Sequence, residues 1–378
     1  YTYYLMPLLM KIWPLLVLTS VINFNALSQS TDIYNNFYSR YYGTVDSNIY
    51  VTANLIVLND ALSGTYNYSY VNRLNEKNKS KSLPVVGSLT NSIAKLKEYG
   101  KNNFFLEGSL SEEKFNGEWI LNDNHISFNL NEEYPPGSME LDVHYLHSEE
   151  RLVKDSTNSP TAELELTLIY PQKSNGSNVH DSISKFISAG FFGINSHSLM
   201  PDSMLTMFEG EYYNNYKDQN TSRYLSGSSF NWQKSISMSV LNNSNGILCL
   251  EYVKYAYSGG AHGMTNISFD NINTENGIRY DYKDIFVDNS DSIISDLLTT
   301  QLYMDKGIPT DIKLSDAGYF VDQIKPNHNL FINNSGVGFV YNSYEIAPYS
   351  YGQTFIFLEY DKIREILCKE TPAFKLLK

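Results

Sequence analysis

Residues 230–240 show the alternation of apolar and polar side chains that is typical of a half-buried β-strand. One set of alternate positions is apolar and the other is polar. The apolar residues are Phe230, Trp232, Ile236, Met238 and Val240, and the polar ones are Asn231, Gln233, Ser235, Ser237 and Ser239. Because successive side chains of a strand point to opposite faces, the segment can bury one face and leave the other wet. It therefore predicts an antiparallel sheet packed on one side.

Residues 32–133 consist of short alternating runs separated by turn residues, with almost no helical periodicity. Asn122-Asp123-Asn124 is expected to form a hairpin turn between a strand ending at Leu121 and one starting at His125. The 31 tyrosines and 19 phenylalanines of the chain suit half-buried sheets. The N-terminal part is therefore predicted to be a meander or a small barrel, either a ligand-binding unit or a spacer.

The C-terminal part mixes strands with amphipathic helices. Residues 293–302 place Leu and Ile on one helical face, and residues 336–341 and 354–360 have the composition of strands. Strands and helices without regular βαβ alternation are typical of α+β folds. We expect an α+β fold, with an antiparallel sheet and covering helices in the C-terminal part, preceded by the mostly-β meander or small barrel.

The expected domain organisation follows these changes in pattern. Pro135-Pro136-Gly137 interrupts the alternation, and residues 148–159 are polar and charged, so we expect a boundary there. The predicted parts are a β-rich domain at 29–135, a linker at 136–160, an α+β domain at 161–368 and a tail at 369–378.

Residues 10–28 resemble a secretory signal peptide. Lys11 supplies the positive end, Ile12–Phe24 is mostly apolar, and Ala26-Leu27-Ser28 is a small-x-small cleavage site. Within the predicted signal segment 1–28, the residues before Met10 are expected to be spurious. The apolar run is short for a membrane span. We expect a mature chain that is exported, periplasmic or secreted, without a transmembrane anchor.

The charge of the chain limits its partners. It has 28 basic and 41 acidic residues, for a net charge of −13, which repels nucleic acid and anionic lipid headgroups. No phosphate-binding, dinucleotide-binding or metalloprotease motif is present, so no cofactor is expected. The two cysteines, Cys249 and Cys368, are compatible with a disulfide, or with Cys249 as a buried core residue.

Two loops between predicted strands combine glycines, aromatic rings and one ionisable residue. The first loop is Tyr257-Ser258-Gly259-Gly260-Ala261-His262-Gly263, and the second loop is Tyr344-Glu345-Ile346-Ala347-Pro348-Tyr349-Ser350-Tyr351-Gly352. Glycines with positive φ let a ligand or another strand approach the backbone. The predicted binding residues are Tyr257, Gly259, Gly260, His262, Tyr344, Glu345 and Tyr349. In the favoured interpretation, His262 clamps the second loop; in the other, it faces a cleft as an acid-base group.

Candidates for catalysis and for metal binding are few. His262 and Glu345 are the catalytic candidates, and Glu345 with Asp284 could form an acid-base pair if the two carboxylates lie close together. His144 and His147 are spaced by three residues but have no third ligand nearby in the sequence, so no metal site is expected.

The chain resembles a known bacterial extracytoplasmic α+β domain of unknown function. The resemblance rests on the two loops, on the strands between them and on the segment Gly338-Phe339-Val340-Tyr341. That domain is similar to the outer part of the membrane anti-sigma factor that senses lysozyme, and to an accessory region attached to some peptidoglycan deacetylases. The resemblance covers about residues 160–365 and implies an exported recognition module of the cell envelope. It supplies no catalytic residues.

Two hypotheses for function follow from these observations. The preferred one is a non-enzymatic envelope module that binds a protein or a glycan, such as peptidoglycan or a lysozyme-like ligand. The alternative is an uncharacterised envelope hydrolase that uses His262 and Glu345. The sequence leaves open the identity of the ligand and the oligomeric state.

Overall fold

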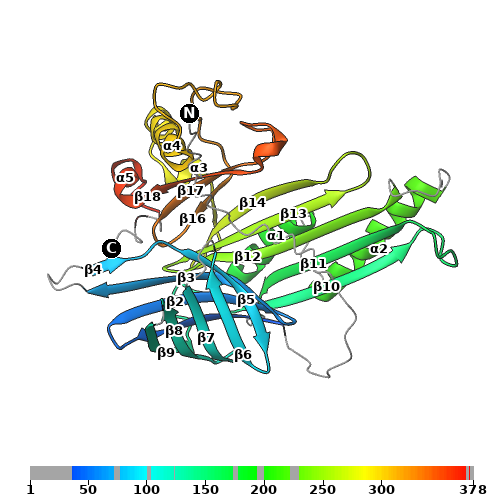
Figure 1. The fold of residues 1–378 in the computed structure, drawn as a ribbon, viewed down its shortest axis with the longest axis horizontal. Coiled ribbons are helices and arrows are strands. Elements are labelled where there is room, and N and C mark those ends of the chain that lie inside the picture. Colours follow the sequence, from blue (N-terminus) through cyan, green and yellow to red (C-terminus); the bar gives the residue numbers. More distant parts are fainter. Residues whose placement is uncertain are drawn as a thin grey trace, which may run out of the picture.

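The computed structural model describes most of the chain after residue 35. The described residues are 36–71, 77–99, 104–122, 124–172, 178–193, 200–221, 230–371 and 374. The predicted signal segment 1–28 and most of the predicted tail 369–378 lie outside them. Figure 1 shows a barrel in blue and cyan, long green strands beside it, and a yellow-to-red C-terminal part on the opposite side of those strands.

The N-terminal part is a closed eight-stranded antiparallel barrel, so the prediction of a meander or small barrel is confirmed. Its strands are β1 (Phe37–Val45), β2 (Ile49–Leu58), β3 (Ala61–Val71), β5 (Leu83–Thr90), β6 (Ile93–Glu98), β7 (Phe104–Leu110), β8 (Lys114–Leu121) and β9 (Asn124–Glu132). β4 (Lys77–Lys79) extends the sheet beside β3. The pairing of β1 with β9 closes the barrel, and apolar side chains fill its interior, as expected for eight strands.

A six-stranded sheet follows the barrel. It contains, in spatial order, β10 (Leu141–Arg151), β11 (Thr161–Pro171), β12 (Trp232–Ser244), β13 (Ile247–Tyr257), β14 (Met264–Asn273) and β15 (Arg279–Tyr280). α1 (Asn178–Phe192) and α2 (Pro201–Asn220) connect β11 to β12 and pack on one face, over Leu164, Leu166 and Leu168. Because this connection crosses over, β11 and β12 are parallel, and the sheet is mixed rather than antiparallel as expected.

The segment 136–160, expected to be a linker, contains β10. β10 pairs with β11 over its whole length, from Leu141 opposite Pro171 to Arg151 opposite Thr161. The polar composition that indicated a linker arises because β10 is an edge strand, where charged residues are well tolerated.

The C-terminal part packs on the other face of the six-stranded sheet. It contains α3 (Tyr282–Ile285), α4 (Asp291–Lys306), a three-stranded sheet of β16 (Leu330–Ile332), β17 (Gly336–Tyr341) and β18 (Thr354–Glu359), the 3₁₀ turns η3 (Tyr349–Tyr351) and η4 (Arg364–Ile366), and α5 (Tyr360–Ile363). Ile294, Leu298 and Leu302 of α4 are buried, as predicted for its apolar face, whereas Ile293, also assigned to that face, is 52% exposed. With three sheets and few helices, the described chain is mostly β, and α+β fits it only roughly.

Asparagine side chains join the sheets. Asn342 pairs with β14 as a strand backbone would: its Oδ1 accepts from Ile267 N at 2.8 Å and its Nδ2 donates to Ile267 O at 3.1 Å. Asn271 connects to Ile332 N and Leu330 O of β16 in the same way. These asparagines join two sheets, because a bidentate side-chain amide satisfies backbone groups where the sheets meet.

The barrel is attached to the six-stranded sheet through another asparagine. Asn243 donates to Tyr38 Oη at 2.9 Å and to Met139 O at 2.7 Å, and accepts from Met139 N at 2.9 Å. Arg40, almost fully buried, donates to the carbonyl oxygens of Asn243 and Glu133. These bonds fix the outer wall of the barrel relative to the sheet.

Candidate functional site

The first and second loops meet at one corner of the six-stranded sheet. The imidazole of His262 stacks on the ring of Tyr349, with centroids 3.9 Å apart and planes inclined by 19°. Tyr349 Oη donates to Gly263 O at 3.0 Å, and His262 Nδ1 lies 3.1 Å from the same oxygen. His262 thus contacts the second loop through a ring rather than through Glu345, and the two loops brace each other.

Glycines permit this approach in the first loop. Gly259 and Gly260 have φ values of 99° and 97°, and Tyr257 Oη donates to Gly260 O at 3.1 Å. A Cβ atom at Gly263 would lie 2.3 Å from Tyr255 Oη, so only glycine fits there without a shift. The loop therefore adopts a backbone conformation that other residues would adopt only with strain.

The second loop carries strain of its own. Tyr344 has φ of 72°, a left-handed conformation that is costly for a bulky residue, by about 1–3 kcal/mol. Its ring centroid lies 5.9 Å from that of Tyr349. Tyr344 is 50% exposed, Tyr349 36% and Tyr351 43%. We name the surface of His262, Tyr344 and Tyr349 the aromatic corner.

The two catalytic candidates are not brought together by any contact in the described part of the chain. Glu345 Oε2 accepts from Asn327 Nδ2 at 3.2 Å, whereas His262 faces Tyr349. Asp284 Oδ2 accepts from Asp281 N at 2.8 Å in the capping box of α3. The carboxylate pair Glu345 and Asp284 thus has separate structural partners.

His144 and His147 lie on opposite faces of β10, because they are an odd number of residues apart in a strand. His144 Nδ1 lies 2.8 Å from Asp202 of α2, and His147 Nε2 lies 3.2 Å from Glu163. They therefore cannot share a metal ion. Cys249 is buried in the C-terminal core, and both it and Cys368 are free thiols.

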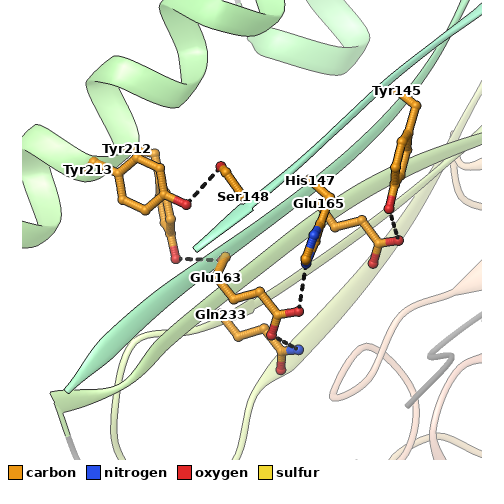
Figure 2. Close-up of polar contacts among 8 residues, drawn as sticks. All are labelled: Tyr145, His147, Ser148, Glu163, Glu165, Tyr212, Tyr213 and Gln233. Atoms are coloured by element: carbon orange, nitrogen blue, oxygen red, sulfur yellow. Dashed lines mark hydrogen bonds and ion pairs between the residues drawn. The ribbon is translucent and has the colours of Figure 1, made fainter. Parts of the chain in front are cut away.

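The helix-free face of β10 to β12 carries a chain of polar contacts (Figure 2). One carboxylate oxygen of Glu163 accepts a hydrogen bond from Gln233 Nε2 at 3.1 Å, and the other lies next to His147 Nε2. Tyr145 Oη donates to Glu165 Oε1 at 3.3 Å. Tyr212 and Tyr213 of α2 approach from the opposite face, where Tyr213 Oη lies 2.8 Å from Ser148 Oγ.

The same face continues into a cavity of about 250 Å³, the barrel–sheet cavity. Its walls come from the outer side of β2, β3 and β5, from β10 to β13 of the six-stranded sheet, and from Phe331 and Asn333 of the C-terminal part. Ser235, Ser237 and Ser239, the predicted wet face of their strand, line this cavity and are partly buried. The barrel covers a face that the alternation alone assigned to solvent.

Glu251 lies in the wall of this cavity and was missed at the level of sequence. It is 1% exposed, its Oε2 accepts from Ser239 Oγ at 2.6 Å, and its Oε1 has no hydrogen-bond partner among the described residues. Burial raises the pKa of its carboxyl from the ordinary 4.5 to about 7. The signal in the sequence was a lone carboxylate inside the apolar strand Ile247–Val253, opposite a row of serines.

Two family models match parts of the chain. Residues 157–265 match the model described as Deacetylase PdaC, and residues 283–361 match the protein of unknown function DUF3298. The first loop lies in the former match and the second loop in the latter, so the aromatic corner joins the two. The chain is thus similar to an unknown-function domain and to a deacetylase-associated one. The similarity to the lysozyme-sensing anti-sigma factor stays a prediction.

Two solved structures resemble the chain. A DUF3298 family member from Bacteroides fragilis is 26% identical, with a TM-score of 0.58 over 63% of this chain and 97% of its own. A DUF3298 family protein from Pseudomonas aeruginosa PAO1 is 16% identical, with a TM-score of 0.44 over 61% of this chain and 96% of its own. No curated protein matches the sequence. None of the described helices is long and apolar enough to cross a membrane.

Proposed function

We propose that this protein is an exported, non-enzymatic recognition module of the bacterial cell envelope, and that its aromatic corner binds the glycan strand of peptidoglycan. The observation that carries the proposal is the stacked pair of His262 and Tyr349, which gathers exposed rings from two loops into one braced surface. Sugar rings present C–H faces that pack on aromatic faces, and tyrosine adds a hydroxyl for hydrogen bonding. Binding costs less when such rings are already held in place.

Three further observations support this function. The matches to Deacetylase PdaC and DUF3298 meet at the corner. The segment 10–28 has the pattern of a secretory signal. His262 and Glu345 have separate partners in the described chain, which favours binding over hydrolysis.

Sedimentation with purified peptidoglycan sacculi tests the proposal. We expect the wild-type protein to sediment with sacculi and Tyr349→Ala to bind at least tenfold more weakly, because the stack and its hydrogen bond to Gly263 are lost. Tyr50→Ala is the matched control, since Tyr50 is a 45% exposed tyrosine on the barrel. Folded wild-type protein that stays in the supernatant contradicts the glycan proposal. Retention on immobilised lysozyme instead would assign the corner to a basic protein ligand.

A further inference from the structure

The barrel–sheet cavity is built from three parts of the chain that are separate in sequence. Leu58 and Val86 come from the barrel, Glu251 and Val253 from the six-stranded sheet, and Phe331 from the C-terminal part. Small-molecule sites occur preferentially where domains meet, and they combine apolar walls with a few polar groups. The cavity has this composition, and no residue of the aromatic corner lines it.

One polar group in the wall lacks a partner. Glu251 Oε1 is buried without a hydrogen-bond donor in the described chain, while Oε2 is bound by Ser239. An unpartnered buried carboxylate oxygen is costly, so a donor within the cavity would stabilise it. The raised pKa of Glu251 is consistent with an environment that lacks a compensating positive charge.

The charged residues in the described lining of the cavity are all acidic. Among the described residues that line the cavity, the charged ones are Asp60, Glu165 and Glu251, and none is a lysine, arginine or histidine. Glu165 already receives a hydrogen bond from Tyr145 Oη at 3.3 Å, whereas Oε1 of Glu251 is buried and has no hydrogen-bond partner among the described residues. A cation with N–H donors complements this arrangement, whereas a carboxylate ligand is repelled.

We propose that the barrel–sheet cavity binds a small amphipathic primary amine, with its ammonium group at Glu251 and its hydrocarbon part against the apolar walls. An ammonium has three donors, and Ser237 and Thr167, which also line the cavity, offer hydroxyl acceptors. Leu58, Val86 and Phe331 provide the apolar surface for the hydrocarbon. This site is independent of the glycan site proposed at the aromatic corner.

Calorimetric titration with hexylamine, hexanol and hexanoate tests the proposal, because the three probes share a chain and differ in the head group. We expect hexylamine to bind with a dissociation constant on the order of 1 mM or tighter, hexanol at least tenfold more weakly, and hexanoate not at all. Equal affinities for the three probes, or no binding of hexylamine to folded protein, would overturn it.

Variants separate the role of Glu251 from a general loss of fold. Glu251→Gln should weaken hexylamine binding at least tenfold, whereas Glu211→Gln, on the exposed side of α2, should leave it unchanged. Ser237→Phe keeps the carboxylate but fills the cavity, and should abolish binding. All three variants are first checked by thermal unfolding. Unchanged hexylamine affinity in folded Glu251→Gln or folded Ser237→Phe contradicts the assignment.

Discussion

The aromatic corner and the barrel–sheet cavity place their functional groups in opposite ways. The corner exposes rings on two short loops, each of which is a contiguous sequence motif, and its main contact runs from one loop to the other. The cavity buries a carboxylate between walls that come from three distant parts of the chain. Candidate residues in short sequence motifs can be singled out from sequence, whereas a cavity made by the packing of one part of the chain on another requires the structure.

The same difference explains what could be predicted. Alternation and turn residues suffice for β12, the barrel strands and α4, because each depends on local periodicity. The role of β10 and the parallel pairing of β11 with β12 depend on tertiary packing. His262 was selected as a candidate because glycines surround it in the sequence. Glu251 was not, since a single carboxylate in an apolar strand gives no sign of what covers it.

The largest expected effect is on the contact between the barrel and the six-stranded sheet, the two parts that supply most of the cavity wall. Asn243→Ala leaves Met139 N, Met139 O and Tyr38 Oη without the side chain that binds them. We expect the free energy of unfolding, measured in urea, to fall by about 3–5 kcal/mol. Hexylamine binding should weaken while sacculus binding by the remaining folded protein persists. Asn266→Ala, at an exposed position of β14, is the control and should be near neutral.

The pH dependence of stability reports on Glu251. Its folded pKa of about 7 exceeds the ordinary 4.5, so the folded state holds this proton more tightly, and stability falls as pH rises between these values. We expect Glu251→Gln to lack this loss. Its free energy of unfolding should match that of the wild type near pH 4.5 and exceed it by roughly 3 kcal/mol above pH 7. Parallel pH profiles of the two proteins would contradict the buried carboxyl.

A smaller effect is expected at Asn342, which precedes the second loop and binds β14. Asn342→Ala removes both hydrogen bonds to Ile267 and should lower the free energy of unfolding by about 1–2 kcal/mol. Because the bonds position the aromatic corner, sacculus binding should also weaken. Asn342→Asp retains the acceptor for Ile267 N and should give an intermediate result. If Asn342→Ala lowers stability but leaves sacculus binding unchanged, the hydrogen bonds of Asn342 do not position the aromatic corner.

The smallest effect on stability is expected at Tyr344. Tyr344→Gly relieves the strain of φ 72° but makes the unfolded chain more flexible, so the two terms offset each other. The free energy of unfolding should change by less than about 1 kcal/mol, while sacculus binding falls several-fold with the loss of an exposed ring. Unaltered binding would exclude Tyr344 from the corner's binding surface.

The central claim is that the protein has two separate binding sites, and a crossed measurement tests it most directly. Tyr349→Ala and Glu251→Gln are each assayed for sacculus sedimentation and for hexylamine titration. We expect Tyr349→Ala to lose sacculus binding and keep hexylamine binding, and Glu251→Gln to show the reverse. A folded variant that loses both activities, or two variants that keep both, would contradict the claim.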